Sequence, residues 1–129
     1  MKNVEQNCVF CKIIAKQIPS TTVFEDEHFL AFLSIDPRSP GHTLIIPKEH
    51  YRWVWDVPAP LYTDYFSLAK KIAEAQKKAF SQELVCAHVE GEEVPHAHIW
   101  IYPDRTTPGD KKDFEGNAMK IREALAKQG

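Results

Sequence analysis

The chain has 129 residues, of which 43% are apolar and 26% charged, and its net charge is −2 with histidine neutral. This size and composition are typical of one globular domain; the small net charge argues against a nucleic-acid-binding face, and no apolar run reaches the length of a membrane span. The N-terminal segment MKNVEQN lacks the apolar core of a signal peptide, and an odd number of cysteines argues against a disulfide framework, so we expect a cytoplasmic protein.

The first half of the chain predicts one short helix followed by three strands. In CVFCKIIAKQIP the apolar residues have helical spacing, and Pro19 is expected to end the helix. Two β-rich runs, 21–24 and 29–33, flank an acidic turn at 25–27. After the turn residues of PRSPGH, the segment HTLIIP predicts a third strand that Pro47 closes.

The second half predicts a long helix, two strands and a weaker helix. Over 61–80 apolar residues recur every three or four positions, with charges on the other face. ELVCAHVE and VPHAHIWIY flank Gly91 as an expected hairpin, in which Cys86 would be a buried free thiol. The last helix, over about 110–127, is expected to begin at the N-cap Asp110.

This order of elements indicates an α+β domain. Consecutive strands with short links predict an antiparallel sheet of about five strands, packed with one long and two shorter helices. We expect residues 1–129 to form a single domain, with the C-terminal helix appended to it.

The segment VPHAHIWIYP carries two histidines two residues apart. In a strand, alternate side chains share a face, so His96, His98 and Trp100 would point one way and small or apolar residues the other. A neutral imidazole that is anchored through one nitrogen by a backbone carbonyl can attack phosphorus with the other. H-x-H alone is a weak signal, and the spacing by itself favours a partly exposed pair or a metal-binding pair over a catalytic one.

Cys8 and Cys11 form a C-x2-C pair. One helical turn would place both thiols on the same side, and the pair supplies two of the four ligands that zinc favours. The alternative is two reduced, buried cysteines. A redox pair is less favoured, because no βαβ unit surrounds the motif.

Four segments, CVFCKIIAKQIP, VFEDEHFLAF, PGHTLIIPKEHY and VPHAHIWIYP, resemble in order and spacing the histidine-triad (HIT) family of nucleotide hydrolases and transferases. The resemblance runs from about Cys8 to Pro103 and implies a HIT-like fold. It also implies that the middle histidine of an H-x-H-x-H run attacks the α-phosphate of a nucleotide and forms a nucleotidyl-histidine, from which water or another acceptor takes the nucleotide. His98 holds the middle position here, His96 the first and Trp100 the third.

Trp100 therefore stands where the family run has its third histidine. An indole cannot shuttle a proton, so it weakens the expectation of fast hydrolysis more than that of nucleotide binding; it also fits a plain core aromatic at the sheet edge. Three functions stay open. The first is an enzyme that cleaves a nucleoside monophosphate from a dinucleoside polyphosphate, a phosphoramidate or a similar conjugate. The second is a catalytically weak nucleotide-binding or sensing module, and the third is a zinc-stabilised interaction protein.

The resemblance further implies where the nucleotide lies. Its base, expected to be a purine, and its sugar would occupy an apolar pocket near the first helix and the second strand, although the apolar residues concerned also fit a plain core. Ser34 stands where the family has an aspartate for the ribose hydroxyls, and serine offers a single hydroxyl. The residues expected to contact the nucleotide are Phe10, Ile13, Ile18, Phe32, Ser34, Ile35, Leu44, Val94, His96, His98 and Trp100.

Zinc and a second copy of the chain are implied in the same way. His96 would belong both to a structural zinc site and to the catalytic face. A homodimer would form across a two-fold axis through the helix 61–80 and a nearby strand. The role of His42 stays open, and His28 and His88 match no motif. The expected zinc ligands are Cys8, Cys11, His50 and His96.

Overall fold

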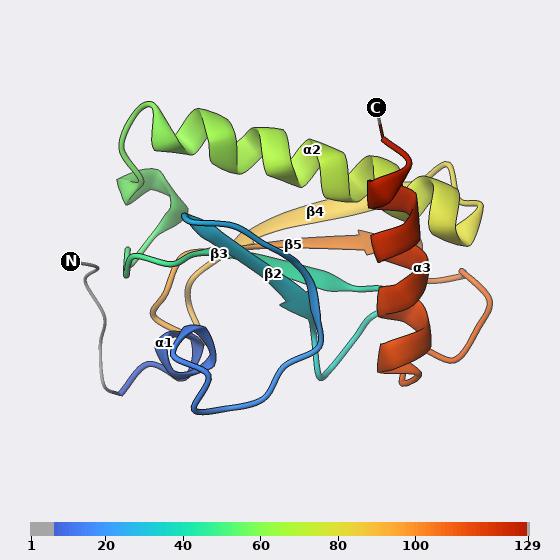
Figure 1. Ribbon diagram of the computed structural model, residues 1–129, viewed down its shortest axis with the longest axis horizontal. Helices are drawn as coiled ribbons and strands as arrows, with labels where there is room; N and C mark the ends of the chain where they lie inside the picture. Colours follow the sequence, from blue (N-terminus) through green and yellow to red (C-terminus); the bar gives the residue numbers. More distant parts are fainter. Residues whose placement is uncertain (1–6, 129) are drawn as a thin grey trace.

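The computed structural model describes residues 7–128 and contains one layer of strands with helices on both faces (Figure 1). The N-terminal segment considered above lies outside these residues, except for Asn7. Within them, none of the helices combines the length and the apolar character that crossing a membrane requires. The order of elements is the predicted one. The elements are α1 (Val9–Ile14), β1 (Thr22–Glu25), β2 (Phe29–Leu33), β3 (Thr43–Pro47), the 3-10 helix η1 (Val54–Asp56), α2 (Leu61–Phe80), β4 (Val85–Glu90), β5 (His98–Pro103) and α3 (Phe114–Ala126).

The five strands form one sheet in the order β1-β2-β3-β5-β4, and each neighbouring pair is antiparallel. The α+β class with an antiparallel sheet is therefore confirmed. β5 lies between β3 and β4, and its register pairs Trp100 with Leu44 on one side and with His88 on the other. Directly paired residues of an antiparallel sheet point to the same face. These three side chains therefore share a face.

The sheet separates two apolar layers. One face packs against α2 and α3 and buries residues such as Ile45 and Ile99. The other face packs against α1 and buries residues such as Phe32 and Leu44. Figure 1 shows α2 and α3 close together, and α1 apart from both. Because both faces are covered, β2 and β3 are buried along their whole length, without the alternation of a strand that faces water on one side.

The prediction that Pro19 ends the first helix is wrong. α1 ends at Ile14, and Lys16 adopts a left-handed backbone with φ 65°. The backbone N–H of Lys16 donates to the Ile13 carbonyl at 3.0 Å, and that of Gln17 donates to the Lys12 carbonyl at 2.9 Å. These paired bonds form a Schellman motif, which satisfies the last carbonyls of the helix before the chain reaches the proline.

The strand predicted from VPHAHIWIY starts later than expected. β5 begins at His98, and His96 precedes it in a turn in which the His96 N–H donates to the Val94 carbonyl at 2.7 Å. The prediction that His96, His98 and Trp100 alternate along one strand is therefore wrong for His96. The His96 ring still lies toward α1, because Phe10 contacts both the His96 and the His98 rings.

Two smaller predictions are also wrong. The N-cap of α3 is Asp113, whose carboxylate accepts from the Gly116 N–H at 3.1 Å, whereas Asp110 caps a preceding turn through the Lys112 N–H at 2.9 Å. The helix therefore begins later than about residue 110. Cys86 is a free cysteine, but it is half-buried on the edge strand β4.

Candidate functional site

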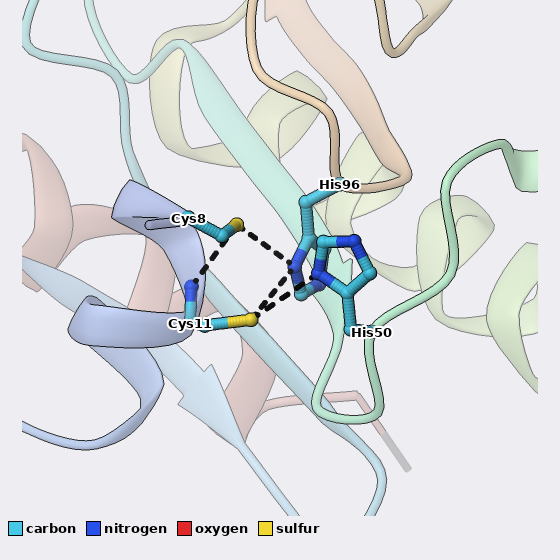
Figure 2. Close-up of side chains that lie close together, drawn as sticks. All are labelled: Cys8, Cys11, His50 and His96. Carbon is cyan, nitrogen blue, oxygen red and sulfur yellow. Dashed lines mark hydrogen bonds between the residues drawn. The ribbon is translucent and has the colours of Figure 1, made fainter. Parts of the chain in front are cut away.

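Four sulfur- and nitrogen-bearing side chains converge beside α1 (Figure 2). Cys8 is the N-cap of α1, and Cys11 lies one turn further on, with its N–H donating to the Cys8 sulfur at 3.4 Å. His50 comes from the segment after β3, and His96 from the turn before β5. Each of the four residues offers one ligand atom, and all four atoms lie within 4.8 Å of one another.

The distances within this group fit a tetrahedral metal ion. The Nδ1 atom of His96 is 3.4 Å from the Cys8 sulfur and 3.5 Å from the Cys11 sulfur, and the Nδ1 atom of His50 is 3.3 Å from the Cys11 sulfur. Around a tetrahedral ion with ordinary metal–ligand bond lengths, sulfur and nitrogen ligands lie about 3.6 Å apart. The group Cys8, Cys11, His50 and His96 could therefore bind a metal, as the sequence predicts.

His96 connects this group to the next histidine. Its Nε2 atom is 2.8 Å from the Pro47 carbonyl oxygen, which can only accept, so Nε2 carries the proton and the lone pair of Nδ1 faces the two sulfurs. A ring anchored in this way is typical of metal-bound histidine. The backbone carbonyl of the same residue is 2.7 Å from Nδ1 of His98. One residue thus offers a ligand to the metal group and a hydrogen-bond acceptor to His98.

The His98 ring has a fixed tautomer. Because the His96 carbonyl can only accept, Nδ1 of His98 carries the proton and its Nε2 atom keeps the lone pair. Burial lowers the pKa of His98, an effect only partly opposed by this hydrogen bond and by the negative charges of Glu90 and Glu93. The ring is therefore neutral at pH 7. Within residues 7–128, no hydrogen bond occupies Nε2.

An aromatic side chain flanks this ring. Phe10 of α1 packs edge-to-face on His98, with ring centroids 4.9 Å apart, and also touches His96 at 5.9 Å. His98 is only 4% exposed. The helix that carries both cysteines therefore also forms one wall of the space around His98.

Most residues predicted to contact a nucleotide lie together in the layer between α1 and the sheet. They share apolar side chains that are buried or half-buried. Leu30 and Ile46 belong to the same layer and were missed by the sequence, because nothing in a wholly apolar strand shows which face a residue occupies. The predicted residues in this layer are Phe10, Ile13, Ile18, Phe32, Leu44, Val94 and Trp100.

Two predicted contacts lie outside this layer. Ile35 is 86% exposed, so the alternative that it is a core residue is wrong. Ser34 is half-buried, and its hydroxyl accepts from the Asp36 N–H at 3.2 Å. Both follow β2 in the turn toward β3. A ligand would meet them at the surface of the apolar layer and not inside it.

Trp100 has basic and aromatic neighbours, of which the sequence singled out His42 but missed His88 and Arg38. His88 stacks on the indole with centroids 5.4 Å apart and an interplanar angle of 13°. The Arg38 guanidinium lies 4.7 Å from the indole centroid, and His42 lies 5.3 Å away. The alternative that Trp100 is only a core aromatic does not explain why polar side chains surround it. His88 could have been placed beside Trp100 only from the register in which β4 and β5 pair. The sequence does not determine this register, because seven residues connect the two strands.

The sequence matches the family model described as the HIT domain over residues 15–107, more than half of the chain. The chain belongs to the HIT family. α3 lies beyond the matched segment.

Relatives and solved structures agree with this assignment. Adenosine 5′-monophosphoramidase HNT1 of Saccharomyces cerevisiae is 36% identical over 132 residues, which cover 93% of this chain and 82% of the yeast protein. A HIT-like protein from Bartonella henselae superposes with a TM-score of 0.83 at 35% identity, covering 94% of this chain and 98% of that one. A zinc-bound histidine triad protein from Mycobacterium smegmatis gives a TM-score of 0.81 at 32% identity, covering 93% and 94%. The predicted HIT-like fold is confirmed.

Proposed function

We propose that the chain is a nucleotide hydrolase or nucleotidyl transferase that works through a covalent nucleotidyl-His98 intermediate. The observation that carries the proposal is the 2.7 Å contact between Nδ1 of His98 and the His96 carbonyl. It fixes the proton on one nitrogen and leaves the other nucleophilic, so no base is needed to activate the ring.

The reaction would have two steps. Nε2 of His98 forms a bond to the α-phosphorus, and the bond from that phosphorus to the leaving group breaks, with its electron pair staying on the leaving group. The His98 ring then carries a positive charge, which the His96 carbonyl and the charges of Glu90 and Glu93 favour. In the second step, water or another acceptor attacks phosphorus and loses a proton to solvent, while the bond between phosphorus and Nε2 breaks and its electron pair returns to the ring, which becomes neutral again. Water gives hydrolysis, and another acceptor gives transfer.

The apolar layer beside α1 would hold the nucleoside. Phe10 touches the His98 ring, and Phe32 packs against Phe10 with centroids 5.6 Å apart. Aromatic walls of this kind suit a flat purine. The yeast relative is named for an adenosine phosphoramidate, which supports a purine here. Ser34 and Ile35 would contact the sugar and the base from the surface, and Val94 the phosphate side.

The metal would be zinc. Two thiolates and two imidazoles form a complete set of ligands for a structural zinc ion, and the relative from Mycobacterium smegmatis is described as zinc-bound. Zinc would supply a rigid cross-link between α1, the segment after β3 and the turn before β5. The residues that would hold it are Cys8, Cys11, His50 and His96.

A nucleotide-binding module with slow turnover is the second candidate, and Trp100 favours it. The indole N–H can only donate a hydrogen bond, so it cannot take a proton from water during the second step. In that case the protein would bind nucleotides tightly and release product slowly.

The substitution His98→Asn separates these candidates. Asparagine keeps an N–H near the His96 carbonyl but offers no nucleophilic nitrogen. We expect His98→Asn to lose turnover of adenosine 5′-phosphoramidate and of diadenosine tetraphosphate, while AMP affinity stays within about threefold. His28→Asn changes an exposed histidine on another part of the chain and is the matched control. Turnover that survives in His98→Asn would contradict the proposal; tight binding without turnover in the unmodified protein would favour the second candidate.

We further infer that the protein is a homodimer. β4 is an edge strand, and a groove of about 800 Å³ runs between η1 and α2. Its apolar lining includes Trp55, Tyr62 and Phe66, which are 74%, 48% and 43% exposed. A second copy of the chain would cover this surface. Light scattering of the unmodified protein should give twice the mass of one chain. Phe66→Glu should reduce the measured mass to that of one chain, whereas the control Met119→Glu on α3 should leave it unchanged. A monomer in the unmodified protein would contradict the inference.

A further inference from the structure

A second group of side chains lies on the same sheet face as His98, further along β5. We call it the Trp100 cluster; its members are aromatic or basic and come from β4, β5 and the segment between β2 and β3. The Arg38 guanidinium covers the rings of Trp100 and Tyr102, at 4.7 and 5.5 Å from their centroids, and donates to the Tyr102 hydroxyl at 3.1 Å. The members are Arg38, His42, His88, Trp100 and Tyr102.

The cation in this cluster has no carboxylate partner in residues 7–128. The ion pairs there join lysine or histidine to Glu25 and Glu27, and none includes Arg38. The guanidinium is half-buried against two rings and forms no ion pair among these residues, although the negative charge of Asp36 acts on the neighbouring His42 ring. A cation in that state favours an anionic ligand.

A buried hydrogen-bond donor lies beside it. The Arg38 backbone N–H donates to Nδ1 of His42 at 3.0 Å, so the proton of the neutral ring is on Nε2. Burial lowers the pKa of His42 to about 4, which keeps the ring neutral at pH 7. Only 2% of His42 is exposed, and its Nε2 atom has no hydrogen-bond partner among residues 7–128. The ring lies 5.3 Å from that of Trp100 and 5.0 Å from that of Tyr102. The indole cannot satisfy this donor, because it has no acceptor itself.

The cluster is placed where the departing part of a substrate would lie. Trp100 follows His98 by two residues on the same face of β5, about 7 Å along the strand. Phe10 contacts His98 from the side of α1, where the nucleoside is proposed to bind. Trp100 borders the same layer at its far end from Phe10, so a group that extends from the phosphorus at His98 along β5 would reach the Trp100 cluster.

From this arrangement we infer that the Trp100 cluster binds the leaving group, and that this group is anionic, as in a nucleoside polyphosphate. The inference rests on the proposed function and specifies its substrate class. When Nε2 of His98 bonds to the α-phosphorus, the phosphorus–oxygen bond to the bridging oxygen breaks and its electron pair stays on that oxygen. The polyphosphate thereby gains one negative charge, which Arg38 and the His42 N–H stabilise. The nitrogen released from a phosphoramidate takes a proton from solvent as its bond to phosphorus breaks, so it leaves as an uncharged amine and gains nothing from them.

The test compares two substrates in three proteins. kcat/KM is measured for diadenosine tetraphosphate and for adenosine 5′-phosphoramidate in the unmodified chain, in Arg38→Gln and in Arg105→Gln, which alters an exposed arginine elsewhere. We expect Arg38→Gln to lower kcat/KM for the tetraphosphate by about tenfold or more and to leave kcat/KM for the phosphoramidate within about twofold of its original value. Arg105→Gln should change kcat/KM for neither substrate. Equal losses on both substrates, or no loss on either, would overturn the inference. Arg38→Met, which still covers the indole, replaces Arg38→Gln if the latter fails to fold.

Binding measurements keep the inference separate from the proposed function. Calorimetry should show ATP binding about tenfold more tightly than AMP, and Arg38→Gln should remove the difference. If the unmodified protein cleaves neither substrate but shows this difference, the proposed function fails and the anionic subsite stands. If His98→Asn abolishes turnover while Arg38→Gln leaves both the substrate ratio and the ATP preference unchanged, the function stands and the subsite fails.

Discussion

Replacing one ligand of the metal group should remove the metal and release α1. Cys11→Ser deletes a sulfur that lies 3.3 Å from His50 and 3.5 Å from His96. A structural zinc site with four ligands is worth about 10–16 kcal/mol, or about 3 kcal/mol per ligand, so the loss of one ligand should weaken zinc binding by about two orders of magnitude. α1 has only six residues, too few to be helical without its cross-links. The wall that Phe10 forms against His98 should then be lost as well.

The assay combines zinc content with hydrogen exchange. Purified protein should contain one zinc per chain, and Cys11→Ser should contain less and should exchange the amide hydrogens of α1 rapidly, while those of α2 stay protected. Cys86→Ser removes the half-buried cysteine of β4 and serves as the matched control, expected to keep both zinc and protection. Full protection of α1 in metal-free Cys11→Ser would refute the reasoning, because the helix would then not depend on the metal group.

Three further predictions concern His42, Gly41 and Trp100. The pKa of His42 is lowered from 6.5 to about 4, so between those values the unfolded chain binds a proton that the folded chain does not, and acid should cost about 3 kcal/mol of unfolding free energy over that range. Urea titrations at several pH values should show a flatter pH dependence in His42→Asn; an unchanged slope would contradict this. Gly41→Ala should lower the unfolding free energy by about 2–4 kcal/mol in the same assay, because φ of Gly41 is +83° and an added Cβ would collide with the Phe80 ring. The loss should exceed that of Gly109→Ala, where the atom nearest to an added Cβ is 3.6 Å away. Equal losses would refute the collision. Trp100→His should speed release of nucleotide from His98 by at least about tenfold in quench-flow, because an imidazole can accept from His42 and move a proton, and an unchanged rate would contradict it.

The order of elements and the metal group were predictable from the sequence. Helical periodicity over 61–80 and short apolar runs between turns determine which segment becomes a helix or a strand. The metal group was predictable because C-x2-C is a local motif and the resemblance supplied His50 and His96. The ends of elements were not. The first helix ends in a Schellman turn at Lys16, and β5 begins after a turn that precedes His98. Both turns depend on backbone geometry that the residue types in those segments do not predict.

The surroundings of Trp100 could not be predicted, for a different reason. His88 meets the indole only because β4 and β5 pair in one particular register, and a slip by one residue would turn it to the other face. Arg38 reaches the indole from a connection between strands, where the direction of a side chain follows from tertiary packing. Contacts between segments distant in the sequence therefore required the structure, whereas the hypothesis that His98 is a nucleophile did not.

The most direct test of the account is to trap the intermediate. Diadenosine tetraphosphate is mixed with the protein, the reaction is quenched within milliseconds at alkaline pH, which a phosphorus–nitrogen bond to histidine survives, and the peptides are analysed by mass spectrometry. We predict one adenosine monophosphate on the peptide that contains His98, an adduct lost on acidification and absent in His98→Asn. An adduct on another residue, or turnover at full rate with no adduct on any peptide, would contradict the central claim that Nε2 of His98 attacks phosphorus.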